Sequence, residues 1–191
     1  MSIMEMAEET MDQIKTRVIG IDIRLDKTTY GIVDIRGEIV AQNFFYTSDY
    51  SDVNDFVSVL ADKLLVLMEE NGGYDSIRSI GISAPSASSV TGCIEHAANL
   101  PWKGVIPLAA LLRDRVGMAV AVANDAHITA LAEKAYGSAH GMKDFVVVSM
   151  SHGGLQLLFL KRHASPWGAG LCRRSGSCLC RAQRTAMWMR Q

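Results

Sequence analysis

The stretch RVIGIDIRLDKTTYGIVDIRGEIVAQNFF, residues 17–45, is the part of the chain from which the fold can be inferred. It holds three short apolar runs, at 17–23, 29–34 and 38–45, each with the length and residue types of a strand. The dipeptide Arg36–Gly37 separates the second run from the third and is a turn signal. We therefore predict a sheet whose second and third strands form a hairpin.

Helical and strand patterns alternate after this stretch. From Val53 to Glu70 the apolar residues recur at helical spacing, and the sequence Asn71–Gly72–Gly73 then supplies residues at which helices commonly end. Further helices are predicted at 106–116 and 126–136, and further strands at 79–83, 119–123 and 144–150. Residues 84–102 are rich in Pro, Ser, Asn and Gly, which predicts a long loop of the kind that often carries function.

This order of elements predicts a mixed α/β fold, in which a sheet that opens with a hairpin continues through crossover helices. By analogy, it is the order of the ribonuclease-H-like N-terminal lobe of the actin/hexokinase superfamily, a mixed sheet with flanking helices. We expect three parts: an N-terminal extension at 1–16, this lobe at 17–150, and a tail at 151–191.

Composition and charge exclude several classes of protein. Hydrophobic residues make up 49% of the chain and charged residues 20%, which is typical of a soluble globular protein. A formal net charge of −1 argues against general affinity for nucleic acid or for an anionic membrane. The acidic N-terminus lacks the order of a secretion signal, so we expect a cytoplasmic protein. The 4 cysteines do not indicate a disulfide scaffold in a chain of 191 residues.

Three segments resemble the ROK family (repressors, open reading frames and kinases), above all its bacterial glucokinases. GIDIRLDKTTYGIVD at 20–34 corresponds to a family pattern of Asp-x-Gly-Gly-Thr before a second strand that ends in Asp. AANLPWKG at 97–104 is similar to the family's APNLPWKG, and VANDAHITALAEKAYGSAHGMKDF at 122–145 matches its Asn-Asp-Ala segment and the helix that follows. The resemblance covers residues 17–150 in the right order, which is more specific than any one motif.

The resemblance implies ATP-dependent phosphorylation of a hexose, with glucose as the default substrate. Asp125 is then the general base that accepts the proton of the sugar hydroxyl, while Asn99 and Asn124 hold other sugar hydroxyls. Position alone favours simpler roles: Asp125 follows an apolar strand and opens a helix, as an N-cap does, and Asn99 reads as a turn residue. The family's members are often dimers, so the resemblance is compatible with a homodimer, although the family's dimer contacts lie largely in the part of the fold that has no counterpart here.

The resemblance also implies ATP and Mg²⁺ as cofactors, with Asp22 and Thr28 as the residues of the phosphate loop that keep family identity. The sequence departs from the pattern between them, where Arg24 and Leu25 replace the two glycines and Asp26 replaces the threonine. Glycines in such loops let backbone N–H groups approach a phosphate closely. The departure therefore keeps open an alternative, a non-catalytic sugar-binding or regulatory relative.

The family's repressors carry a helix-turn-helix domain ahead of the sugar-binding fold. Only 16 residues precede the first predicted strand, which is too few for that domain, so we do not expect DNA binding.

Residues 151–191 do not match the family as written. They contain no Asp or Glu but hold Cys172, Cys178, Cys180, Trp167 and Trp188, a mixture that suits neither a solvated tail nor a core.

Reading each codon of this tail one nucleotide late turns Met187–Trp188 into Cys-Gly, where the family has a zinc-binding motif. Our hypothesis is that a frameshift near Met150 scrambled and truncated the chain, leaving a disordered tail without the family zinc site and a weak or inactive enzyme. The rival is a natural, unrelated tail, and Cys178-x-Cys180 is a weak zinc signal under either reading.

Overall fold

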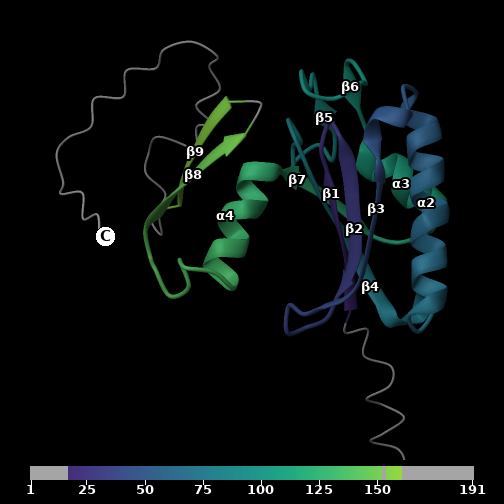
Figure 1. Cartoon of the computed structure of the whole chain (residues 1–191), viewed down its shortest axis with the longest axis horizontal. Coiled ribbons are helices and arrows are strands. Elements are labelled where there is room, and N and C mark those ends of the chain that lie inside the picture. The colour runs from purple at the N-terminus through teal and green to yellow at the C-terminus, as the bar shows by residue number, and fades with distance from the viewer. Residues whose placement is uncertain (1–16, 152–153, 161–191) are drawn as a thin grey trace, which may run out of the picture.

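The computed structural model describes residues 17–151 and 154–160, and a five-stranded sheet is its centre (Figure 1). An antiparallel arrangement joins the first three strands, each to the next: β1 (Arg17–Ile23), β2 (Lys27–Val33) and β3 (Ile39–Tyr46). Two further strands run parallel to β1, namely β4 (Ile77–Ala84) and β7 (Val120–Asn124). The strand order is β3-β2-β1-β4-β7. The predicted mixed α/β fold and its hairpin are confirmed.

Two helices cover one face of the sheet (Figure 1). The helix α2 (Val53–Glu70) has the predicted bounds, because Asp52 caps its start by accepting the N–H of Asn54 and the Asn71 side chain donates to the Leu67 carbonyl at its end. The helix α3 (Leu108–Val116) ends at Gly117, whose left-handed φ of 69° closes the last turn. Short 3-10 helices, η1 (Thr47–Asp49) and η2 (Tyr74–Ser76), flank α2.

The hydrophobic core lies between this face and the helices. Alternate residues of β1, which are Ile19, Ile21 and Ile23, are buried there, as strand geometry requires of a face packed on helices. They meet the apolar stripe of α2, where Phe56 is fully buried and packs against Trp102 with ring centroids 4.4 Å apart. The opposite face of β1 carries Val18, Gly20 and Asp22, none of them fully buried.

The long loop after β4 has structure that the sequence did not predict. Two short strands, β5 (Ile94–Glu95) and β6 (Val105–Ile106), pair antiparallel within it. The predicted helix at 106–116 therefore begins later, at Leu108, because Ile106 belongs to β6 and Pro107 stands at the N-cap. The indole of Trp102 donates a hydrogen bond of 3.1 Å to the carbonyl of Tyr50, which ties this loop to the core.

A helix and a hairpin form a second group, on the other side of the sheet from α2 (Figure 1). The helix is α4 (Asp125–Ala135), and the hairpin pairs β8 (Phe145–Ser151) with β9 (Gly154–Leu160) in a separate two-stranded sheet. We expected the first of these strands to continue the main sheet, and we expected disorder from residue 151. Instead the run GLQLLFL at 154–160, which has the apolar character of a strand, pairs with β8 along its whole length.

The remaining sequence-based expectations for the chain ends concern residues 1–16, 152–153 and 161–191, which lie outside the described residues. These expectations include the frameshift and the missing zinc motif. Within the described part of the chain, no helix combines the length and the apolar character needed to cross a membrane.

Candidate functional site

The candidate site lies at the edge of the sheet where three parallel strands end. In register, Asp22 of β1 stands opposite Ser83 of β4, and Ser83 stands opposite Ala123 of β7. With strands spaced about 4.8 Å apart, this row places the Cα atoms of Asp22 and Ala123 about 10 Å from each other. Ligands of open α/β sheets bind outside the carboxyl ends of such strands. Asn124 and Asp125 follow Ala123 directly and so belong to this edge.

Asn124 and Asp125 form the junction between β7 and α4. Asn124 has extended backbone angles and is the N-cap of α4: its side-chain oxygen accepts the N–H of Ala126 at 3.1 Å. The carboxylate of Asp125 accepts the same N–H at 2.9 Å, and both side chains are half-buried. We predicted a helix from 126 and, from position alone, a cap at Asp125. The structure gives the cap to Asn124 and makes Asp125 the first helical residue.

Asn99 lies in the turn between β5 and β6, with an exposed side chain. Its neighbours Ala97 and Leu100 are buried, so the turn is held on the core by residues on both sides of Asn99. No hydrogen bond joins Asn99 to Asn124 or Asp125 within the described residues. The structure thus places the predicted general base Asp125 next to one predicted sugar-binding residue, Asn124, and leaves the other, Asn99, on a separate, anchored loop.

Two residues of the same long loop have unusual backbone angles. Ser86 and His96 have φ values of 57° and 50°, and they are the non-glycine residues with positive φ among those that the structure describes. Such conformations cost free energy and are concentrated at functional loops. The sequence does not mark either position, because serine is not enriched at positive φ and the enrichment of histidine there is too weak to single out His96.

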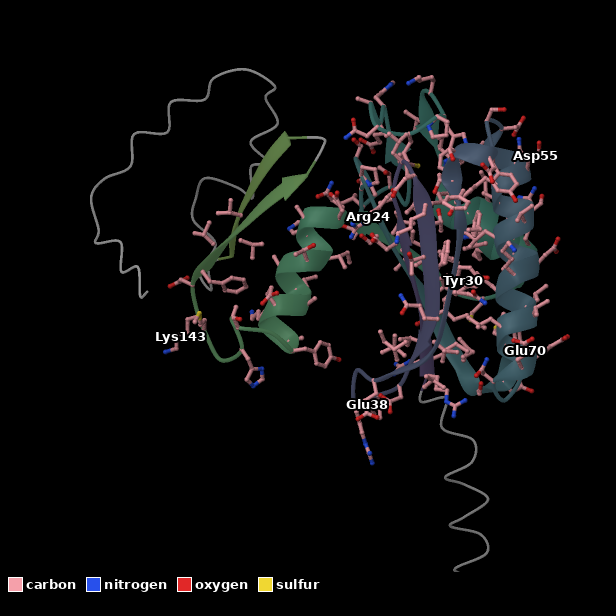
Figure 2. The ribbon with its side chains drawn as sticks, viewed as in Figure 1. Arg24, Tyr30, Glu38, Asp55, Glu70 and Lys143 are labelled. Carbon is pink, nitrogen blue, oxygen red and sulfur yellow. The ribbon has the colours of Figure 1, made fainter. Side chains whose placement is uncertain are left out.

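The β1–β2 loop holds Asp22 in an ion pair. The Nε of Arg24 donates to a carboxylate oxygen of Asp22 at 2.7 Å, with 69% of the Arg24 side chain and 37% of the Asp22 side chain exposed. Figure 2 shows Arg24 at the end of the sheet near which α4 begins. The predicted phosphate-loop aspartate is thus at the candidate site, with a guanidinium as its partner.

Thr28, the other predicted phosphate-loop residue, faces away from this site. Its side chain is fully buried, and its hydroxyl lies 2.8 Å from that of Thr47, which is fully buried as well. In register Thr28 stands opposite Ile23, whereas Thr29 stands opposite Asp22 and shares its face. Counting alternate residues from Asp22 across the hairpin would have pointed to Thr29.

The fold and this edge define a class of protein. The mixed five-stranded sheet, with its hairpin and crossover helices, is the ribonuclease-H-like lobe of the actin/hexokinase-like fold that solved ROK kinases share. The ROK family model matches residues 18–154, and the chain belongs to the ROK family. This confirms the resemblance that the three sequence segments carried.

Known relatives include sugar kinases and a regulator. The glucokinase of Streptomyces coelicolor is 26% identical over 136 residues, which are 71% of this chain and 41% of that enzyme. A ROK family glucokinase from Streptomyces griseus, solved in complex with glucose and AMPPNP, gives a TM-score of 0.67 at 24% identity, over 81% of this chain and 48% of that one. The chain thus spans less than half the length of these relatives.

A regulator is equally similar in fold. The ROK family transcriptional regulator that is a homologue of the Escherichia coli MLC protein gives a TM-score of 0.71 at 19% identity, over 90% of this chain and 45% of that one. At such identities the solved structures establish the fold and leave catalysis open.

Proposed function

We propose that this chain provides the hexose site of a ROK family sugar kinase, with glucose as the default substrate and Asp125 as the general base. One observation carries the proposal: a carboxylate and an amide, on Asp125 and Asn124, stand side by side where three parallel strands end. The relatives support the choice of ligand, since one was solved with glucose and a ROK family protein from Streptococcus pneumoniae was solved with sucrose.

The chemistry needs a carboxylate within hydrogen-bond reach of the hydroxyl that reacts. Asp125 would take the proton from that hydroxyl, which makes the sugar oxygen a stronger nucleophile. Asn124 and Asn99 would orient the sugar, because an amide both donates and accepts hydrogen bonds. In the structure the backbone N–H of Ala126 donates both to the Asp125 carboxylate and to the Asn124 side chain. A sugar hydroxyl could therefore replace this N–H as the donor to Asp125, while Asn124 continues to cap the helix.

Glucose titration of the native chain, by calorimetry, tests the proposal. Replacing Asp125 with Ala removes a charge-assisted hydrogen bond, so we expect glucose affinity to fall by about tenfold or more. Asp62→Ala is the matched control, because Asp62 is an exposed carboxylate on α2 and its loss should leave the affinity for glucose unchanged. If the native chain takes up no hexose, or if both variants behave alike, the proposal fails.

The second candidate is a sugar-binding protein without catalysis. It is favoured by the Arg24–Asp22 ion pair and by the loop that lacks the family's glycines. The two candidates differ in their response to nucleotide: a kinase site should bind glucose differently when MgATP is present, whereas a regulator's sugar affinity should be indifferent to it. Calorimetry with and without MgATP separates them.

A further inference from the structure

The backbone of the β1–β2 loop, residues 24–26, is a closed turn. The N–H of Arg24 donates to the Lys27 carbonyl at 3.1 Å, and the Asp26 carbonyl accepts the N–H of Thr47 at 3.0 Å. None of the three residues has a positive φ. Loops that hold phosphate aim successive N–H groups at the anion, and this arrangement relies on glycine or left-handed positions. The loop therefore has neither the residues nor the conformation of a phosphate cradle.

The side chains of the loop also disfavour an incoming anion. Arg24 donates to Asp22, so the one guanidinium here already has a carboxylate partner. Asp26 adds a second carboxylate, and the Nζ of Lys27 lies over the Phe44 ring, 5.7 Å from its centroid. Leu25 is 57% exposed and places an apolar side chain beside these charges. The phosphates of the ATP that the family implies do not fit these residues.

We propose that residues 24–26 exclude nucleotide phosphates from this edge of the sheet and that Arg24 is the resident counter-ion of Asp22. The sugar site then responds to sugar alone, which favours the non-catalytic sugar-binding candidate over the kinase; this consequence rests on the proposed hexose site. An exposed ion pair is weak and would yield to a strong ligand, so the exclusion comes from the side chains and backbone of the turn together.

The test uses magnesium tripolyphosphate as the probe, because it presents phosphates without requiring any contact to a nucleoside. The full chain is compared with the triple variant R24G/L25G/D26T, which restores the glycines and threonine of the family pattern. The native chain should bind the probe only weakly, with a dissociation constant in the millimolar range, and the triple variant should bind at least about tenfold more tightly. Asp62→Asn changes the net charge without touching the loop and should behave as native.

A single substitution covers the case in which the triple variant does not fold. Asp26→Asn leaves the chain length and turn intact and removes one carboxylate, so tripolyphosphate affinity should rise by about threefold. No gain in Asp26→Asn, or none in a folded triple variant, overturns the proposal.

A second outcome also overturns the proposal: the native chain binds tripolyphosphate tightly and Arg24→Ala weakens that binding. Arg24 would then be a phosphate ligand. Glucose titrations on the same samples keep the two proposals apart. If the native protein binds no glucose, the proposed hexose site is wrong. The proposal that residues 24–26 exclude phosphate is then still tested by the tripolyphosphate affinities alone.

Discussion

Thr28 and Thr47 form a hydrogen bond between their hydroxyls inside an apolar core, and the stability of the fold should depend on this pair. Each hydroxyl is fully buried and has the other as its partner at 2.8 Å. Thr28→Val should cost about 1–3 kcal/mol, because it leaves the Thr47 hydroxyl buried without that partner. The double Thr→Val variant should cost less than the sum of the single changes, since it removes both polar groups together. Urea unfolding of the native protein, the two single variants and the double variant gives the coupling energy between the two hydroxyls. If the effects of the single changes simply add, the hydrogen bond between Thr28 and Thr47 does not contribute to stability.

Single residues also show where sequence reasoning stopped. Asp125 and Asn124 could be found because a polar pair directly after an apolar strand is visible in the sequence. The burial of Thr28 could not be found, because it depends on the register of β1 against β2. Neither could the left-handed angles of Ser86 and His96, which the surrounding loop imposes.

At the scale of strands, two glycines that stand opposite each other have different surroundings. A Cβ on Gly31 of β2 would lie 2.6 Å from the Ala41 carbonyl oxygen, whereas a Cβ on Gly20 of β1 would meet nothing within 4 Å. Gly31→Ala should therefore destabilise the fold by about 1–3 kcal/mol. Gly20→Ala should be neutral or slightly stabilising, because alanine restricts the unfolded chain. The denaturant midpoints of the two variants, measured side by side, test this. Equal effects at both positions would contradict the close approach of β3 to Gly31.

The elements differ in how well the sequence predicted them. The helix α2 was predicted with its observed bounds, since its apolar stripe, its cap and its terminating residues are all local. The strands β5 and β6 were missed because each has two residues and exists through pairing with the other. The strand β9 was not predicted, although its apolar run is typical of a strand, because the residues after Met150 do not match the family pattern.

For the whole molecule, one buried ionisable group predicts how stability changes at high pH. Burial, with a smaller effect from the negative charge of Glu70, raises the pKa of Tyr30 above its ordinary value of 10.0. Figure 2 labels both residues. The unfolded chain then loses the phenol proton first, so stability should be unaffected below pH 10 and should fall above it.

The expected slope is at most about 1.4 kcal/mol per pH unit, up to the folded pKa. Unfolding free energies of native protein and Tyr30→Phe, measured between pH 8 and about 11, test this. The variant should lose less stability over that range, and parallel curves would rule Tyr30 out as the cause.

The direct passage from β7 into α4 has a consequence for how the chain can vary. No residue separates Asn124, the end of the strand, from Asp125, the start of the helix. Because no linker residue lies between the two elements, the direction of the Asp125 side chain depends on how α4 is wound. One inserted residue would turn it by about 100° around the helix axis and carry the carboxylate away from the strand ends. Length changes among homologues should therefore avoid this point and collect in the segment between α4 and β8.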